Sequence, residues 1–454
     1  GTRAVEIICR QSAGTNNYYF RPVEHVRLTV DLLSGRVLQY NFNTPVTVPS
    51  AQGISFNAGA VPPRANVKDV KLIQPDGASF TLNDHVLSWQ GFNMHLRLDF
   101  RTGMTISDVS FADPLTANGA RRSILYQATL SELYVPYMDP DVDWYFKSYM
   151  DSGEYGWGNF LSTAATVNCP EYAIYLNATA LDVNGNPFAI DKYACVFERT
   201  LAEPAWSHVD PRVGTYESRK AIELVVRTVA TIGNYDYLHD TVFRQDGTIS
   251  FRVGATGLIA VKGVNATSFA DLEDAREDPV LSTGTMVSPN RVGVFHDHYF
   301  NFRLDMDVDG PTNNFIKEDI KLKRLGQSAG YGRKGIWKLD RKVLKKERSA
   351  RLRPNMMEPS VWSVQSNSKS PVGNFRGYQI APSHTAISML PPHDPVQMRA
   401  RFSEHTVWVT PYNPDEKYAG GKFVVLSDGS DGLYEWTEQN RDITNKDIVV
   451  WYTL

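Results

Sequence analysis

The fold and the chemistry of this chain centre on one stretch, residues 231–237, which reads Thr231-Ile232-Gly233-Asn234-Tyr235-Asp236-Tyr237. A Gly-Asn pair between β-prone residues is a hairpin turn signal. Tyr235 and Tyr237 are two positions apart, so they share one face of the strand that follows the turn. By itself this pattern indicates an ordinary strand that carries core tyrosines. Motifs elsewhere in the chain change this interpretation.

Three motifs accompany residues 231–237. They are Tyr149-Met150-Asp151-Ser152-Gly153-Glu154-Tyr155-Gly156 upstream, His296-Asp297-His298 downstream, and Leu304-Asp305-Met306-Asp307-Val308-Asp309-Gly310 shortly after the histidines. Together the four stretches resemble the copper amine oxidases, in which the first tyrosine of an Asn-Tyr-Asp/Glu triplet becomes the topaquinone cofactor. The resemblance runs from about Asn17 to Leu454.

Length and charge narrow the class of protein. A chain of 454 residues can bury a large core. Its 47 basic and 50 acidic side chains nearly cancel, which argues against a nucleic acid as partner. No apolar run approaches the roughly 18 residues that a membrane span needs. The sequence starts without methionine or a signal peptide, so we expect that a leader has been removed.

Strand signals dominate the chain. From Val67 onward, short apolar alternations are separated by turn residues, which predicts a mainly β protein with a large antiparallel β-sandwich over residues 67–454. Residues 26–30 and 36–42 alternate around a Leu-Ser-Gly turn and predict a hairpin. The resemblance implies that residues 1–45 are the C-terminal part of a small α/β domain. Residues 46–66 are rich in Pro, Gly, Ala and Asn and are typical of a linker.

One segment is strongly basic. Residues 317–353 carry fourteen basic and four acidic side chains. Its glycines predict a flexible loop in the first half, and residues 340–352 are compatible with a short basic helix. Two interpretations stay open, a docking patch for an anion, a membrane or a polysaccharide, and a solvated surface insertion. The docking interpretation would make the protein a glycan-binding β-sandwich.

His296 and His298 are candidate metal ligands. One residue separates them, so on a strand both side chains point to one face and can bind one ion. Imidazole ligands suit copper. The resemblance implies a third histidine shortly after a motif like residues 445–453, so we expect it beyond Leu454. The alternative is a non-catalytic scaffold or binding protein that resembles an amine oxidase but lacks a complete copper site.

The resemblance also implies the catalytic residues. No ordinary side chain accepts two electrons reversibly, so amine oxidation needs a cofactor. Tyr235 would be the topaquinone precursor, and Asp151 the base that takes a proton from the substrate carbon next to nitrogen. Tyr137 would hydrogen-bond the quinone, Asn234 would pack on its ring, and Tyr149, on the strand face of Asp151, would act as a gate. Core tyrosines and a turn aspartate are the alternative interpretation.

Asp305, Asp307 and Asp309 alternate along the chain. Three carboxylates on one strand face repel one another unless a cation lies between them. The resemblance implies a peripheral calcium-type site built from Asp305, Asp307, the Met306 carbonyl and the pair Asp447-Ile448. On an unbroken strand this site and the histidines would lie on opposite faces, which makes the second metal structural. A solvated acidic edge is the alternative.

The cysteines and sequons bear on the compartment. Cys169 and Cys195 flank a predicted hairpin, and the spacing leaves open a disulfide or two buried thiols. The resemblance implies the disulfide, and we expect Cys9 to be a free, buried thiol. Asn-x-Thr sequons at Asn177 and Asn265 agree with a secretory route and a glycoprotein. We therefore expect a secreted protein, with peroxisomal and cytoplasmic locations as alternatives.

The resemblance implies a homodimer that oxidises a primary amine with O2 and releases an aldehyde, ammonia and hydrogen peroxide. Copper(II), topaquinone and a structural Ca²⁺ are the cofactors that it implies. The segment between Tyr235 and His296 is longer than usual for the family, and residues 268–279 are acidic and loop-like. The identity of the amine does not follow from the sequence.

Overall fold

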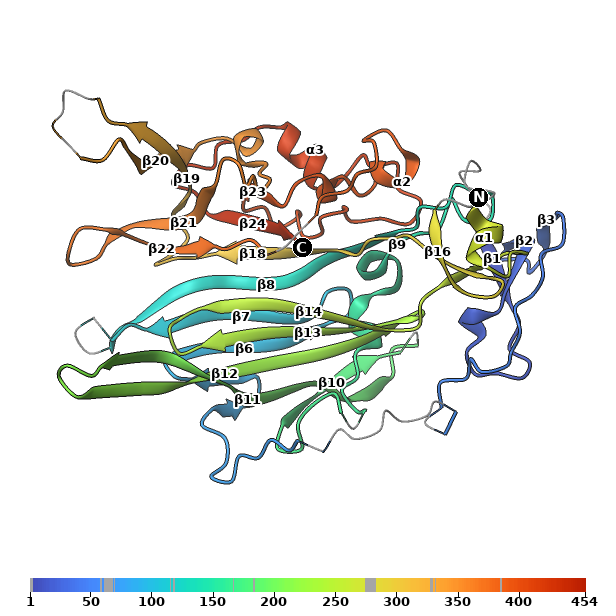
Figure 1. Ribbon diagram of the computed structural model, residues 1–454, viewed down its shortest axis with the longest axis horizontal. Helices are drawn as coiled ribbons and strands as arrows, with labels where there is room; N and C mark the ends of the chain where they lie inside the picture. The colour runs from blue at the N-terminus through green and yellow to red at the C-terminus, as the bar shows by residue number, and fades with distance from the viewer. Residues whose placement is uncertain are drawn as a thin grey trace.

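Strands in five antiparallel sheets make up most of the structure (Figure 1). The structure is a computed structural model. It describes residues 3–454 except 58, 61–67, 69, 115, 117–118, 166, 183, 274–282, 327–329, 331 and 384–385. Residues 58 and 61–66 of the predicted 46–66 linker, and residues 274–279 of the predicted acidic loop at 268–279, lie outside the described residues. Phe269–Glu273 form a short α-helix, which corrects the loop prediction for that part.

A nine-stranded sheet forms one layer of the sandwich, with strand order β23-β24-β18-β8-β7-β6-β5-β4 and with β9 paired to β8. Its strands are β4 (Thr81–Asn83), β5 (Val86–Trp89), β6 (Phe92–Asp99), β7 (Gly103–Ala112), β8 (Arg121–Pro136), β9 (Ser148–Met150), β18 (Tyr299–Met306), β23 (Val407–Pro411) and β24 (Ile448–Thr453). The long strand β8 lies in the middle and pairs with β7, β9 and β18.

A five-stranded sheet forms the other layer. It consists of β10 (Ile174–Leu181), β11 (Pro187–Asp210), β12 (Thr215–Ile232), β13 (Tyr235–Arg244) and β14 (Ile249–Gly257), in that order. Aromatic side chains join the two layers. The rings of Phe92 and Phe243 lie 5.2 Å apart, and those of Phe251 and Phe302 lie 5.3 Å apart. Burial of these large apolar rings is the main stabilising contribution between the layers. The predicted antiparallel β-sandwich is confirmed.

Two smaller sheets and a few short helices complete the sandwich. The four-stranded sheet contains β19 (Asn313–Arg324), β20 (Gly335–Leu344), β21 (Ser360–Lys369) and β22 (Phe375–Ile380), and a three-stranded sheet contains β15 (Val261–Gly263), β16 (Gly284–Ser288) and β17 (Arg291–Val294). The α-helices are α1 (Phe269–Glu273), α2 (Pro395–Met398) and α3 (Leu433–Glu438). None of the helices in the described part of the chain has the length and apolar character that crossing a membrane requires.

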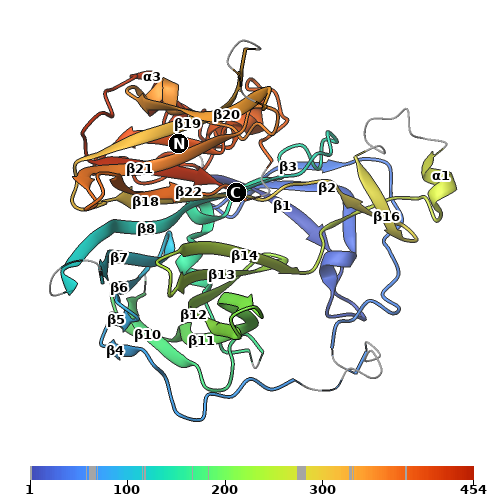
Figure 2. The ribbon, with the colours of Figure 1, turned by 60° about the vertical axis from the view of Figure 1, so that its left-hand side comes forward.

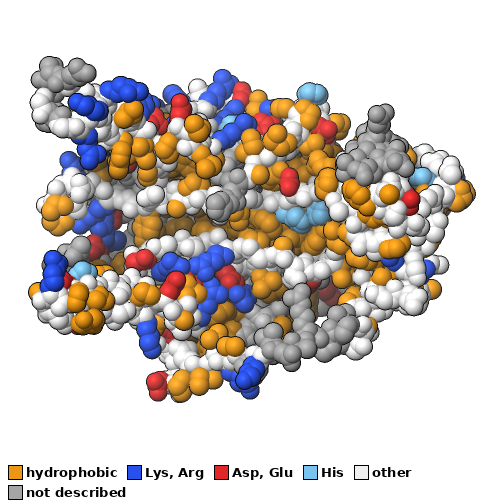
Figure 3. All heavy atoms as spheres, in the orientation of Figure 1, with side chains coloured by type: hydrophobic (Ala, Val, Ile, Leu, Met, Phe, Trp, Pro, Cys, Tyr) orange, Lys and Arg blue, Asp and Glu red, His pale blue; other side chains and the backbone are white. Residues whose placement is uncertain are grey.

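The basic segment is a β-hairpin, which corrects the predicted loop and helix. β19 pairs with β20 from Phe315↔Leu344 to Arg324↔Gly335, and beyond Leu344 only a 3-10 turn at Glu347–Ala350 is helical. The Asp319 carboxylate lies 2.8 Å from the ammonium groups of both Lys317 and Lys342, so one acidic residue pairs with a lysine on each of the two strands. The ladder pairs residues far apart in sequence, and local composition cannot show such a partner. Figure 3 shows the basic side chains of this hairpin at one corner of the molecule.

A separate N-terminal sheet packs against the sandwich (Figure 2). It consists of β1 (Ala4–Arg10), β2 (Pro22–Asp31) and β3 (Val37–Phe42), so the hairpin predicted over residues 26–42 is confirmed. Glu24 of β2 accepts a hydrogen bond of 2.8 Å from the Gly263 N–H of β15, which ties this sheet to the sandwich. Residues 3–45 contain no α-helix, and their origin in a small α/β domain stays a prediction.

Candidate active site

The hairpin β12–β13 positions Tyr235. Ile232 pairs with Tyr235, so Gly233 and Asn234 form a two-residue turn, and Gly233 has the positive φ of 61° that suits the first turn position. The Asn234 amide donates to the Leu258 carbonyl at 2.6 Å, and the Leu258 N–H donates back to the Asn234 carbonyl at 2.7 Å. Tyr235 is therefore held at the start of a strand by hydrogen bonds to the end of β14.

Gly257 makes this close approach possible. It pairs with Tyr235 and has a φ of 107°, which L side chains rarely adopt. A Cβ atom at position 257 would lie 2.6 Å from the Asn234 carbonyl oxygen and 2.9 Å from the Tyr235 Cα. The end of β14 can lie against the tyrosine hairpin only because residue 257 has no side chain.

His296 receives the Tyr235 hydroxyl. Its Nδ1 lies 2.8 Å from the Val294 carbonyl oxygen, which can only accept, so Nδ1 carries the proton and Nε2 keeps its lone pair. The Tyr235 hydroxyl lies 2.8 Å from this Nε2 and donates to it. The two histidine rings lie 5.0 Å apart. Both residues lie between β17 and β18 rather than inside one strand, but their rings still face one site.

Both histidines are suited to bind a metal in their neutral form. The Tyr237 hydroxyl lies 3.0 Å from Nδ1 of His298, so each histidine contacts one tyrosine of the hairpin. Burial lowers the pKa of His296, and it lowers the pKa of His298 to about 4, with His296 as a second cause. Neutral imidazoles are the protonation state that coordination needs. Two such rings fit a copper ion.

Tyr137 lies where the sequence predicts a partner for the Tyr235 ring. It follows β8 and forms an isolated β-bridge with His296, and its ring stacks on the imidazole at 4.4 Å with an angle of 16°. Burial raises the pKa of Tyr235, and the hydrogen bond from Tyr137 opposes that rise. Tyr149 on β9 packs edge-on against Tyr137 at 6.1 Å. The three phenol rings therefore form one continuous wall.

Asp151 is buried next to this wall. It begins a π-helical turn, Asp151–Tyr155, directly after β9, so the expectation that it shares a strand face with Tyr149 is wrong. Burial raises the pKa of Asp151 well above its usual range, and the neighbouring carboxyls of Glu132 and Glu154 add to the rise. Asp151 in turn raises the pKa of Tyr237.

Glu132 supports the Asp151 turn and was not singled out from the sequence. It is fully buried on β8 and accepts hydrogen bonds from the N–H groups of Ser152 at 2.9 Å and Gly153 at 3.1 Å. Burial raises its pKa to about 7, although Arg101 lies 3.7 Å away. The signal in the sequence was an acidic residue inside the apolar run of a core strand, which is rare without a purpose.

A cavity of about 400 Å³ opens onto these groups. Asp151, Tyr137, Tyr149 and Asn234 line it together with Tyr235, so the structure brings the five predicted catalytic residues to one cavity. The N-terminal sheet supplies the facing wall, which no local sequence pattern indicates. This facing wall includes Ile8, Cys9, Arg10, Pro22, Val23 and Glu24.

Two residues of this cavity depart from expectation. Cys9 is free, as predicted, but it is half-buried and lines the cavity, so the prediction of a buried thiol is wrong. Lys147 is buried, and its ammonium lies 3.3 Å above the Trp144 ring. Burial lowers the pKa of Lys147 to about 8, against the opposing charge of Glu24. Position 147 was not predicted, because the charge that opposes it, Glu24, lies in a distant segment.

The predicted calcium-type ligands also meet. Asp305, Asp307 and Asp447 each offer a carboxylate oxygen, and these oxygens lie within 4.8 Å of one another. Burial raises the pKa values of Asp305 and Asp307 to about 6, and Asp447 contributes to both rises. Asp309 is instead bound by Arg122 and Ser368, since β18 ends at Met306 and the expected run along one face is broken. Ca²⁺ at this cluster stays a prediction.

Cys169 and Cys195 form a disulfide, with their Cα atoms 6.5 Å apart, so the predicted bridge is confirmed. Both sequon asparagines are exposed. The Asn177 side-chain oxygen accepts from the Lys192 N–H, and that of Asn265 accepts from Thr47. Glycosylation stays a prediction.

The site combines a tyrosine hydroxyl on a histidine, a second histidine beside it and a buried carboxylate, in a β-sandwich. Residues 81–454 match the family described as copper amine oxidase, enzyme domain. This chain belongs to the copper amine oxidase family.

Relatives and solved structures agree with this assignment. The copper-containing amine oxidase gamma 1 of Arabidopsis thaliana is 37% identical over 466 residues, which cover 100% of this chain and 64% of the relative. A primary amine oxidase of Pisum sativum is 35% identical over 460 residues, which cover 100% of this chain and 66% of that protein. The chain thus spans just under two thirds of their length.

The fold is shared with a copper-containing benzylamine oxidase of Hansenula polymorpha. That structure superposes with a TM-score of 0.86 at 24% sequence identity, over 100% of this chain and 70% of the other. At this identity the likeness supports the fold, and the chemistry has to be argued from the residues of this chain.

Proposed function

We propose that this chain carries the catalytic part of an oxidase that converts a primary amine and O2 into an aldehyde, ammonia and hydrogen peroxide. The observation that carries the proposal is the Tyr235 hydroxyl, 2.8 Å from the lone-pair nitrogen of His296, in a cavity that Asp151 also lines. Membership of the copper amine oxidase family supports it.

His296 and His298 are the proposed copper ligands. Copper there would supply a redox metal for converting Tyr235 to topaquinone, and the quinone would supply the two-electron acceptor that ordinary side chains lack. The third histidine that the family resemblance implies would complete the copper ligands.

Asp151 is the proposed base. A carboxylate whose pKa is raised above its usual range by burial is a stronger base, so it can take a proton from carbon and later release it. Its burial in the π-helical turn limits its motion, and Glu132 fixes that turn through two backbone N–H groups. Tyr137 and Asn234 would hold the modified ring in one orientation, and Tyr149 would flank its access from the cavity.

The test is formation of a quinone that depends on Tyr235. We expect the protein purified from its source, loaded aerobically with copper, to give a positive redox-cycling quinone stain and to release hydrogen peroxide with benzylamine as the probe amine. Tyr235→Phe should abolish the stain, because it removes the oxygen that oxidation needs. Tyr237→Phe is the matched control, since it removes the other histidine-bound hydroxyl and should keep the stain. A colourless wild-type protein with bound copper would instead support a non-catalytic scaffold.

We also propose that the protein is a homodimer. Two hairpins extend from one end of the molecule (Figure 1). Both carry exposed apolar side chains, which are Leu201, Trp206, Val209, Val213 and Tyr216 on β11–β12, and Leu322, Trp337 and Leu339 on β19–β20. Exposed apolar patches of this kind mark interaction surfaces. Sedimentation equilibrium should give twice the chain mass, and a Trp206→Asp, Trp337→Asp variant should shift the protein towards the monomer.

We propose that the protein is secreted. Among the relatives, two enzymes of Arabidopsis thaliana, alpha 2 and alpha 3, are named peroxisomal. The disulfide and the two exposed sequons of this chain favour a secretory route. We expect an endoglycosidase to reduce the mass of the protein purified from its source, and an unchanged mass would favour the other compartments.

A further inference from the structure

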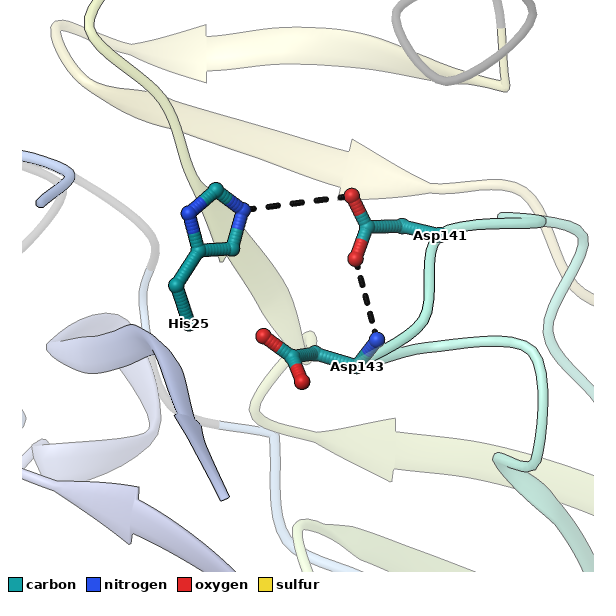
Figure 4. Close-up of side chains that lie close together, drawn as sticks. All are labelled: His25, Asp141 and Asp143. Atoms are coloured by element: carbon teal, nitrogen blue, oxygen red, sulfur yellow. Dashed lines mark hydrogen bonds and ion pairs between the residues drawn. The ribbon is translucent and has the colours of Figure 1, made fainter. Parts of the chain in front are cut away.

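A second group of potential metal ligands lies where the N-terminal sheet meets the sandwich. His25 is on β2, and Asp141 and Asp143 are in the loop between β8 and β9 (Figure 4). One ligand atom from each residue lies within 4.8 Å of the other two. The histidine and the carboxylates come from segments more than a hundred residues apart, so only the tertiary structure brings them together.

The hydrogen bonds of His25 prepare its other nitrogen for a cation. Nδ1 lies 2.7 Å from the Thr44 carbonyl oxygen, which only accepts, so Nδ1 carries the proton. A neutral ring then presents the lone pair of Nε2 to Asp141 Oδ2 at 3.9 Å, which is too long for a hydrogen bond. Metal-binding histidines commonly donate their second nitrogen to a backbone carbonyl in this way.

Asp143 supplies an independent observation. Its Oδ2 atom is buried and, within the described part of the chain, accepts no hydrogen bond. Figure 4 shows the carboxylate between the loop backbone and the His25 ring. A buried carboxylate oxygen without a partner is costly, and binding a cation is one way to remove that cost.

The cations near the cluster have other first partners. Lys262 makes its shorter ion pair with Asp139, at 2.8 Å, and lies 3.5 Å from Asp141. The charge of Lys147 is opposed first by Glu24, and Arg27 pairs with Glu6 at 3.4 Å. Asp143 makes no ion pair in the described part of the chain, so a cation beside His25 would meet a carboxylate that has none.

We propose that Nε2 of His25 and the carboxylates of Asp141 and Asp143 bind a divalent cation of the Zn²⁺ type. One imidazole with two carboxylates is a donor set for Zn²⁺, because hard ions such as Ca²⁺ take oxygen ligands alone. Tetrahedral Zn²⁺ with bonds of about 2.0–2.2 Å holds its ligand atoms roughly 3.4 Å apart. Side-chain rotations that move the three ligand atoms by about 1 Å would therefore complete the site.

The bound cation would clamp the N-terminal sheet to the sandwich. Two hydrogen bonds already join these segments, from Arg27 on β2 to the Val142 carbonyl at 2.9 Å and from the Trp144 indole N–H to Glu24 at 3.0 Å. The same two segments carry Glu24 and Trp144, which line the cavity next to Tyr235. The site is therefore a structural one that holds the facing wall of the cavity in place, and it does not depend on copper or the quinone.

The test measures Zn²⁺ binding in the whole chain after one equivalent of copper has been added, so that the histidine pair at 296 and 298 does not compete. We expect one further Zn²⁺ per chain by elemental analysis after gel filtration. Zn²⁺ should also slow amide hydrogen exchange in β2 and β3. His25→Gln and Asp143→Asn should each weaken Zn²⁺ binding at least tenfold in calorimetric titration and remove the exchange protection.

His208→Gln is the matched control, because His208 is exposed on β11, far along the chain from this cluster. It should bind Zn²⁺ as the wild type does. Two results would overturn the proposal, namely no extra Zn²⁺ in the wild type, or equal binding in the His25→Gln, Asp143→Asn double variant. A simple His25–Asp141 ion pair would show as exchange protection at acidic pH that Zn²⁺ leaves unchanged.

Discussion

Replacing Gly257 by alanine should displace Tyr235 from the histidine pair. The new Cβ would lie 2.6 Å from the Asn234 carbonyl oxygen and 2.9 Å from the Tyr235 Cα, and both are backbone atoms that cannot rotate away. The end of β14 must therefore move from the hairpin that carries Tyr235. The hydrogen bonds between Asn234 and Leu258 would be lost or lengthened.

The magnitude follows from two contributions. A non-glycine residue at a φ of 107° costs about 1–3 kcal/mol of strain. Overpacking against backbone costs about 1–3 kcal/mol, and the stiffer unfolded chain returns roughly 0.4–1 kcal/mol. The free energy of unfolding should fall by about 2–4 kcal/mol. For a chain of this length that is a Tm decrease of roughly 2–4 °C.

The matched control is Gly254→Ala in the same strand. Gly254 has no positive φ, and a Cβ there meets only the Leu238 Cβ at 3.7 Å, an ordinary contact. Calorimetry should show a Tm within about 1 °C of the wild type, since alanine suits a strand interior better than glycine. The quinone stain should be strong in Gly254→Ala and weak in Gly257→Ala. Equal Tm values and equal stains in the two variants would refute the reasoning.

Further predictions concern Glu132 beneath the Asp151 turn, the Cys169–Cys195 disulfide and the acidic cluster of Asp305, Asp307 and Asp447. Glu132→Gln removes a negative charge that raises the pKa of Asp151. The acidic limb of the plot of kcat/KM against pH should therefore move to lower pH. An acidic limb at the same pH as in the wild type would contradict Asp151 as the base. Burial raises the pKa of Glu132 itself to about 7. Its contribution to the stability of the fold is therefore present at low pH and is lost as the pH rises towards 7. In Glu132→Gln, the Tm should change less over this pH range than in the wild type. Cys169→Ala with Cys195→Ala opens a bridge between residues 26 apart and should cost about 3–4 kcal/mol in urea unfolding, with the single Cys9→Ala variant as the near-neutral control. Ca²⁺ at about 100 times its Kd should raise the free energy of unfolding of the wild type by roughly 2.7 kcal/mol and leave that of Asp447→Asn unchanged. If Ca²⁺ does not stabilise the wild type, the three carboxylates are a solvated acidic cluster.

Much of the site was predictable because its residues lie in short motifs. The Asn234-Tyr235-Asp236 triplet, the His296 and His298 pair and Asp151 can each be found from local spacing and family resemblance. The structure brings Asn234, Tyr235 and Asp151 to one cavity and His296 to the Tyr235 hydroxyl. The period-two alternation predicted the β-sandwich for the same reason, since strand side chains alternate locally. Where the local pattern was misleading, as in the basic segment 317–353, the strand pairing is made with distant residues.

The sequence by itself determined the family and the β class, and it indicated the tyrosine, histidines and acid that we propose for the site, because those properties depend on residue type and short spacing. Only the tertiary structure decided what surrounds them. Glu132 under the Asp151 turn, the cavity wall from Cys9 to Glu24, and the meeting of His25 with Asp141 all join segments distant in sequence. Such contacts are selected by burial and charge balance in the folded chain, and those energies arise only after the sheets have packed.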